Sequence, residues 1–180
     1  MSDPWASLGT LEAHLWARLA RAAVDAEDPL RTVALATAGP EGPQVRMVAL
    51  RAVDPAVSRV EIHTDLRTPK IGQIRHDPRG QILGWDADAR LQVRLSVTLT
   101  VVAADSERWH EVPPEARTNY GTDPVPGAAI DGPGAFSRRP ARERFAALVG
   151  TVTGIDVVSL AHQPHRRARF GTDGGTWLAP

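Results

Sequence analysis

The chain has 180 residues, no cysteine, and 21 basic side chains that balance 21 acidic ones. This length suits one domain with a substantial core. The balanced charge gives no bulk field that would favour nucleic acid or a membrane as partner, and the missing cysteine excludes disulfides, thiol catalysis and thiolate metal sites. The N-terminus has no signal-like character and no apolar run is long enough to span a membrane, so we expect a cytoplasmic protein.

An amphipathic helix is the first predicted element, because apolar residues recur at helical spacing over residues 5–24. It is expected to end before Asp28-Pro29 and to serve packing. Strand-forming residues then predict four strands, at 31–38, at 44–53, around Val60 and Ile62, and at 81–85. The prolines of the first turn, residues 39–43, predict an irregular hairpin connection.

The clearest alternation lies in residues 92–101, where aliphatic and polar side chains alternate and predict a strand with one buried face. The elements expected after it are a short helix from Ser106 through Trp109, a second helix starting at Pro113-Pro114, a loop over 121–135, a helix over 140–149, and strands at 151–160 and 165–170. An early Pro140 and a following Gly150 are typical of a helix start and end.

The order of these elements favours a mainly β, α+β fold. The strands are many and short, the helices are few, and regular βαβ alternation is missing. This pattern is typical of a closed antiparallel barrel.

Two arginines on the second predicted strand are candidate anion ligands. Arg46 and Arg51 differ in parity, so they face opposite sides of a regular strand and lie roughly 16 Å apart. Two separate anionic groups are therefore possible. The alternative is that both are solvated charges on a strand edge.

A helix start supplies a second set of donors. Thr68 suits the N-cap and Pro69 the first helical position, where its missing N–H costs nothing. The free amides of Lys70 and Ile71, the helix dipole and the Lys70 ammonium would then converge on an anion. Together with Arg46, this start predicts a phosphate site.

Three motifs carry a family resemblance. The order R-M-V-x-L-(K/R), then (Y/H)-T-(N/D)-L-x-(S/T)-x-K, then Q-V-R occurs here at residues 46–51, 63–70 and 92–94. This order resembles the pyridoxamine phosphate oxidase family of FMN-binding split barrels, and the form over 64–70 is most similar to a divergent bacterial branch described only as oxidase-related FMN-binding proteins. The resemblance covers most of residues 30–180, is strong over 44–102 and is weak over 105–150.

The resemblance implies an antiparallel split β-barrel with peripheral helices, and a homodimer that binds FMN in clefts between its subunits. The whole chain, residues 1–180, would form one such domain. Its parts would be an N-terminal helix at 5–24, the barrel core with the phosphate motifs at 30–102, a helical and loop insertion at 103–150, and closing strands at 151–180.

The resemblance also implies the cofactor site. Arg46 and Lys70 would hold the FMN phosphate with Thr68 beside them, and Gln92 would hydrogen-bond the edge of the flavin ring. The other implied cofactor residues are Met47, Val48, His63, Thr64 and Arg169. Without the family, the same pattern suits a half-exposed histidine and a polar barrel face.

The implied substrate site departs from the family pattern. Arg51 matches the basic residue that grips the substrate phosphate. The oxidases carry R-L-H-D-R-F near the C-terminus, and here His165 and Arg167 replace its two substrate residues, whereas Arg169 keeps the cofactor arginine. We therefore expect a kept cofactor site, a rebuilt substrate site, and poor activity on pyridoxamine phosphate.

The leading interpretation is an FMN-dependent oxidoreductase that acts on an unidentified small molecule. Two alternatives stay open: a flavin-binding carrier or sensor without turnover, and a split barrel that binds deazaflavin or haem. We expect no metal site, because the six histidines are scattered and His162 and His165 would face apart in a strand. The sequence has no nucleophile elbow of a serine hydrolase.

Overall fold

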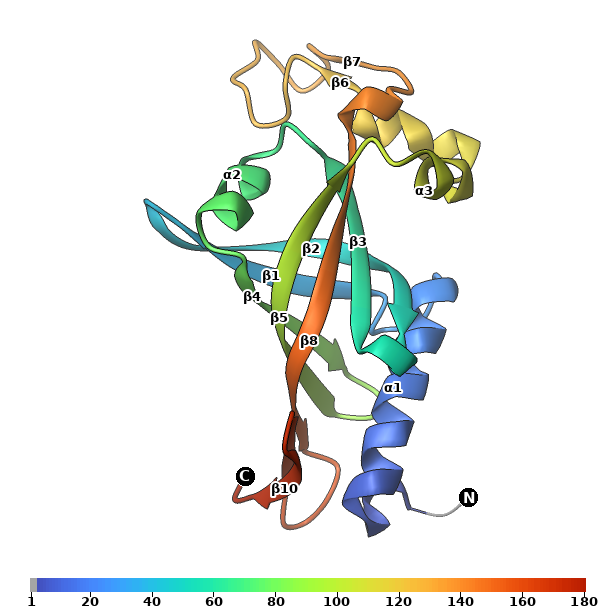
Figure 1. The fold of residues 1–180 in the computed structure, drawn as a ribbon, viewed down its shortest axis with the longest axis vertical. Coiled ribbons are helices and arrows are strands. Elements are labelled where there is room, and N and C mark those ends of the chain that lie inside the picture. Colours follow the sequence, from blue (N-terminus) through green and yellow to red (C-terminus); the bar gives the residue numbers. More distant parts are fainter. Residues whose placement is uncertain (1–2) are drawn as a thin grey trace.

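Six antiparallel strands close into a barrel in the computed structural model of the protein, which describes residues 3–180 (Figure 1). Their order is β8-β3-β2-β1-β4-β5, and β5 pairs back onto β8. Each strand contains or overlaps a predicted one, so the predicted antiparallel barrel is confirmed. The strands are β1 (Thr32–Gly39), β2 (Gly42–Asp54), β3 (Arg59–Asp65), β4 (Arg79–Asp86), β5 (Leu91–Ala103) and β8 (Phe145–Ser159).

Apolar side chains that point inward from the strands fill the barrel, and they alternate most regularly on β5. On β5, the side chains of Leu91, Val93, Leu95, Val97 and Leu99 are buried, and the residues between them are half-buried or exposed. Leu35, Leu50, Ile62 and Ile82 bring the other strands into the same core. Burying each such side chain stabilises the fold by about 1.5–3 kcal/mol.

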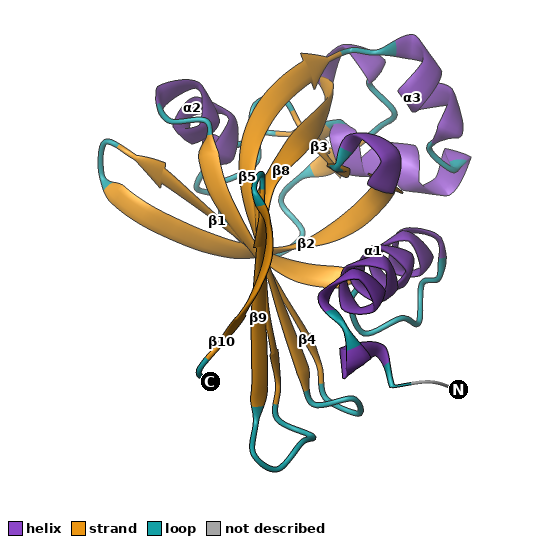
Figure 2. Ribbon diagram, turned by 60° about the horizontal axis from the view of Figure 1, so that its bottom comes forward, coloured by secondary structure: helices purple, strands orange, loops and turns teal. Residues whose placement is uncertain are grey.

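A long N-terminal helix covers one side of the barrel. After a short 3₁₀ turn, η1 (Pro4–Ala6), the helix α1 (Leu8–Val24) begins with a capping box between Ser7 and Thr10. Its apolar face contacts β2, and Figure 2 shows it beside that strand. The Arg31 guanidinium donates to the carbonyls of Ala22 and Ala23 near its C-terminal end. The helix predicted over 5–24 is therefore confirmed, with a break at Ser7.

The remaining elements gather at the two ends of the long axis. Toward one end lie α3 (Ser106–Glu111), η3 (Pro114–Tyr120) and a two-stranded ladder of β6 (Thr122–Asp123) and β7 (Ser137–Arg138) (Figure 1). At the other end lies the hairpin of β9 (Arg166–Gly171) and β10 (Gly174–Leu178). The chain also contains η2 (Pro55–Val57), α2 (Pro69–His76) and η4 (Arg142–Arg144).

The helix predicted over 140–149 is wrong. Residues from Phe145 onward belong to β8, where they pair with β3 from Asp65 to Arg59. Ala146 and Leu148 face the barrel core, whereas Phe145 and Ala147 face a second cluster with Trp109 and Tyr120. A strand buried on both faces shows no alternation, so its short apolar run cannot be told from a helix by periodicity.

We predict that Phe145→Ala lowers the free energy of unfolding by about 3–5 kcal/mol, because it leaves a cavity at a fully buried ring. Urea denaturation measures the change. Phe136→Ala is the matched control, since that ring is exposed, and should stay within about 0.5 kcal/mol. Equal losses in the two variants would contradict the burial of Phe145 between two clusters.

Candidate functional site

Arg46 connects β2 to β1 and α2 through neutral acceptors. Its Nη1 donates to the Thr37 hydroxyl at 2.6 Å and to the Leu35 carbonyl at 3.2 Å. Its Nη2 donates to Gln73 Oε1 at 2.8 Å. These partners orient the guanidinium without cancelling its charge, and burial lowers the pKa of Arg46.

Lys70 brings a second cation to the same region. It is the only lysine of the chain, and its Nζ donates to the Thr64 hydroxyl at 3.0 Å. Burial, and then the nearby charge of Arg46, lower the pKa of Lys70 below its usual value, while Asp65 acts in the opposite direction. The chain therefore holds two half-buried cations close together.

No carboxylate neutralises these two cations within residues 3–180. The ion pairs of that part of the chain involve neither Arg46 nor Lys70. Asp65 is held by Arg67, whose Nε and Nη2 donate to its two carboxylate oxygens at 3.0 and 2.7 Å. Two cations with only neutral partners repel each other, and a bound dianion would relieve that repulsion. The arrangement is suited to binding an anion.

The helix start offers fewer donors than predicted. Thr68 occupies the N-cap position, but its hydroxyl donates to the Asp65 carbonyl at 2.8 Å and makes no cap hydrogen bond. The Ile71 amide donates to the Thr68 carbonyl at 3.0 Å, so it is not free. Because the Thr68 hydroxyl and the Ile71 amide donate to these carbonyls, neither is free to donate to an anion. Pro69 is the first helical residue, as predicted.

Sequence reasoning missed the residues that hold Arg46 in place. Thr37 and Gln73 are buried, their side chains are joined at 2.6 Å, and Gln73 also donates to Gln44 at 2.8 Å. Gly39 leaves room for this contact, because a Cβ there would lie 2.9 Å from Gln73 Cγ. These polar groups carry no motif. The lone lysine in an arginine-rich chain was the available signal for the site itself.

Arg51 lies at a β-bulge. Leu50 pairs with Ile62 and Ala52 pairs with Glu61, so the register skips Arg51. Because a bulge interrupts alternation, parity alone does not decide which face Arg51 occupies, but its surroundings differ from those of Arg46: Arg51 lies near Tyr120 of the second cluster. Arg51 lies near Arg31, whose pKa it lowers after the larger effect of burial.

His63 belongs to a different set of contacts from Thr64. Its Nε2 lies 2.8 Å from Glu61 Oε1, and Arg108 Nε donates to Glu61 Oε2 at 2.9 Å. Its ring packs edge-on against Phe145 at 4.9 Å between centroids. Successive residues of β3 point to opposite faces, so Thr64 joins Lys70 and His63 does not.

The outer face of the sheet carries three more predicted cofactor residues. One register row runs from Met47 through Ala34 and Leu83 to Arg94, Asp156 and Arg169. Gln92 lies in the neighbouring row with Trp85 and Val158. Val48 has the opposite parity from Met47 and packs against the barrel core. Met47, Gln92 and Arg169 therefore share a face that Arg46 does not point to.

The predicted substrate residues near the C-terminus lie far from Lys70 in one chain. Arg167 is held by Asp156, with Nε–Oδ1 and Nη2–Oδ2 distances of 3.2 and 2.9 Å, and Arg94 shares that carboxylate at 2.9 Å. His165 is exposed. The β9–β10 hairpin and α2 lie toward opposite ends of the long axis (Figure 1).

Comparison with known proteins shows the family. The profile described as "Pyridoxamine 5'-phosphate oxidase, FMN-binding domain" matches residues 13–103. The chain belongs to this family, and the resemblance seen in its motifs is confirmed. No helix within residues 3–180 is long and apolar enough to cross a membrane. In the same residues, no three histidine or acidic side chains gather into a possible metal site.

Individual relatives share about a third or less of their aligned residues with this chain. "Pyridoxine/pyridoxamine 5'-phosphate oxidase 2" of Arabidopsis thaliana is 32% identical over 95 residues, which are 51% of this chain and 48% of that protein. The match therefore spans about half of that curated relative. A structure of a pyridoxamine 5'-phosphate oxidase-related, FMN-binding protein from Nostoc punctiforme PCC 73102 is 24% identical, with a TM-score of 0.73 over the whole of both chains.

A second solved structure has the same fold. PhzG from Burkholderia lata 383, in complex with tetrahydrophenazine-1-carboxylic acid, is 20% identical with a TM-score of 0.72. The similarity covers 99% of this chain and 95% of PhzG. Identities this low show that the fold is shared.

We predict that Lys70→Met leaves the ligand-free protein as stable as the wild type or more stable at pH 7. The folded state lowers the pKa of Lys70, so the unfolded chain binds more protons and wild-type stability rises with pH up to about 10.5. The advantage of the variant should shrink over the same range. Urea denaturation at several pH values measures this, and a variant that is clearly less stable at pH 7 would contradict it.

Proposed function

We propose that the protein binds FMN and acts as a flavin-dependent oxidoreductase. The observation that carries this proposal is the pair of half-buried cations, Arg46 and Lys70, that have neutral partners and no carboxylate within residues 3–180. A phosphate dianion matches that charge, and the family of the chain is defined by an FMN-binding domain.

The residues present fit the phosphate end of FMN. Arg46 would donate from its fixed guanidinium, and Lys70 would add its ammonium, with the hydroxyls of Thr64 and Thr68 beside it. Gln73 and Thr37 would keep Arg46 in position while the ligand exchanges. FMN supplies the redox chemistry through its ring when bound, and the chain supplies anchoring, orientation and polar contacts.

We propose a homodimer in which the second copy completes the site. The outer sheet face exposes a set of large apolar side chains, namely Val45 (69% exposed), Met47 (63%), Trp85 (45%) and Leu83 (39%). Apolar residues gathered on one sheet face are typical of an interface. The predicted cofactor residues Met47, Gln92 and Arg169 lie on this face, so a second copy there would add contacts that one chain cannot provide.

We propose that the substrate is not pyridoxamine phosphate. Arg167 forms an ion pair with Asp156. Burial raises the pKa of this carboxyl, but Arg167 and Arg94 lower it by more, so the pKa lies below its usual value. Recruiting Arg167 to a substrate would break this pair and leave the almost fully buried Asp156 carboxylate with Arg94 as its remaining ion-pair partner in the described residues. The ion pair supports a substrate site that differs from that of the oxidases.

We predict that one FMN binds per chain and that Arg46→Gln raises the dissociation constant about 10- to 100-fold, because charge-assisted hydrogen bonds are lost. Quenching of flavin fluorescence measures the affinity. Arg59→Gln is the matched control, since Arg59 is exposed on β3 and is not part of the pair formed by Arg46 and Lys70. Equal affinities in wild type and Arg46→Gln would contradict the assignment.

The oxidoreductase proposal has its own test. We expect FMN on the protein to be reduced anaerobically by NAD(P)H or an amine donor and to be reoxidised in repeated turnovers. Absorbance at the flavin maximum follows both steps. FMN that binds but never turns over would favour the carrier or sensor, and mass identification of a different purified cofactor would favour the deazaflavin or haem alternative.

We predict a dimer mass in light scattering at micromolar concentration, and a monomer for Leu83→Asp, because a carboxylate would be buried in the apolar interface. Val57→Asp is the control, since Val57 is also an exposed aliphatic residue but lies on η2. A wild-type monomer with FMN bound would contradict the shared site.

We predict that pyridoxamine phosphate is oxidised at least about 10²-fold more slowly than by a true pyridoxamine phosphate oxidase, since lost positioning contacts reduce rate steeply. Hydrogen peroxide release, measured with both enzymes in parallel, settles the point. Comparable rates would show that the replaced residues rebuild the same substrate site.

A further inference from the structure

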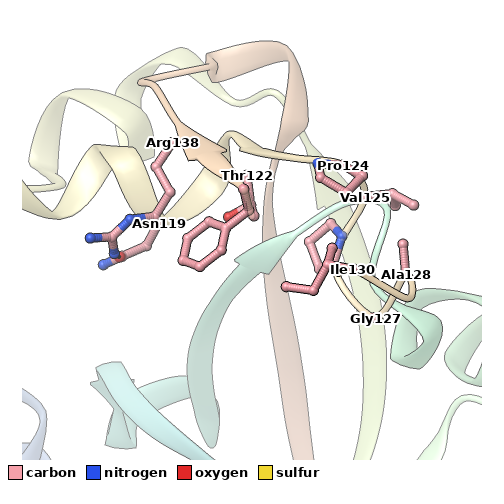
Figure 3. Close-up of a pocket in the computed structure, with 10 residues that line it drawn as sticks. Asn119, Thr122, Pro124, Val125, Gly127, Ala128, Ile130 and Arg138 are labelled. Carbon is pink, nitrogen blue, oxygen red and sulfur yellow. The ribbon is translucent and has the colours of Figure 1, made fainter. Parts of the chain in front are cut away.

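The segment between β6 and β7 forms a cavity that the proposed function does not use. Its volume is about 340 Å³, which lies in the range of small-molecule sites (Figure 3). Most of its wall is apolar, and three polar residues complete it. The lining residues are Pro124, Val125, Pro126, Gly127, Ala128, Ile130 and Phe136, with Asn119, Thr122 and Arg138.

The cavity has one charged side and one apolar side. Figure 3 shows Arg138 and Asn119 on one side, and Val125, Ala128 and Ile130 on the other. Arg138 Nη1 donates to Asn119 Oδ1 at 3.3 Å, a neutral partner. No acidic side chain pairs with Arg138 in the part of the chain that the structure describes. The arginine can therefore receive an anionic group.

Backbone contacts hold the charged side of the cavity in place. Thr122 pairs with Arg138 and Asp123 with Ser137, and the Arg139 amide donates to the Gly121 carbonyl at 3.3 Å. A Cβ at Gly121 would lie 1.7 Å from the Arg139 carbonyl oxygen, so this close approach requires glycine. The charged side of the cavity is thus fixed by a ladder.

The cavity also adjoins the start of α2. Arg67 Nη2 donates to the Thr122 carbonyl at 2.6 Å while it holds Asp65. A Cβ at Gly127 would lie 3.8 Å from Pro69 Cγ, which places the cavity wall against the residue before Lys70. The cavity is therefore a neighbour of the cation pair, but it has its own arginine and its own apolar wall.

We propose that this cavity binds a small amphipathic carboxylate. The apolar body of the ligand lies against Val125, Ile130 and Phe136, and its carboxylate accepts hydrogen bonds from Arg138. Charge-assisted hydrogen bonds from an arginine give such a ligand its orientation, and the apolar wall gives it contact area. Neither Arg46 nor Lys70 takes part, so this site is separate from that of the proposed function.

The test uses 2-naphthoate as probe and 2-naphthalenemethanol as its neutral analogue, both titrated calorimetrically into the full chain without added FMN. We expect one naphthoate per chain. Arg138→Gln should weaken naphthoate about 10-fold or more and leave the alcohol unchanged. Phe136→Ala should weaken both probes. Arg139→Gln is the matched control, since Arg139 is the next residue but does not line the cavity.

Two results would overturn the proposal. One is the absence of naphthoate binding at millimolar concentration, and the other is equal naphthoate affinity in wild type and Arg138→Gln. An FMN titration of Arg138→Gln distinguishes this proposal from the proposed function. The variant should bind FMN with the affinity of the wild type, because Arg138 is not part of the proposed phosphate site. Loss of FMN binding in that variant would show that the two sites are one.

Discussion

The pairing of β8 with two neighbours is the constraint on which the rest of the structure depends. Phe145–Thr151 pair with β3, and the same strand pairs with β5 from Ala146 to Ser159. Because β8 fills the gap between β3 and β5, the barrel has no open edge there. The pairing also ends β3 at Asp65 beside Phe145, and the chain then turns into α2. The position of the cation pair follows from where that strand ends.

The cation pair illustrates how a binding site can work against the stability of its own fold. Arg46 and Lys70 are half-buried, near each other and partnered by hydroxyl, amide and carbonyl groups. Elsewhere the chain neutralises such charges, as Asp65 does for Arg67 and Asp156 for Arg167. Buried charges without an opposite partner are costly, and their pKa values shift accordingly. The phosphate of the proposed ligand would supply the missing opposite charge.

The candidate site residues are divided between the two faces of the sheet. Arg46 points toward Thr37 and α2, whereas Met47, its neighbour in sequence, belongs to the register row on the outer face that runs to Arg169. A ligand anchored by the first face and covered by the second needs chain from both sides. In the homodimer that we propose, the C-terminal hairpin of one chain would approach the α2 end of the other, and this would account for the incomplete set in one chain.

The sequence by itself determined the barrel class, most strands, the long first helix and the identity of both cations, because alternation and short motifs are local properties. Only the tertiary structure decided that residues 145–149 are a strand, since the first residues of β8 are buried on both faces and this run of apolar residues has no period. It also decided which partners hold Arg46, because Thr37 and Gln73 approach it from other elements. The bulge at Arg51 and the ion pair between Arg167 and Asp156 depend on the register between neighbouring strands, which no single segment encodes.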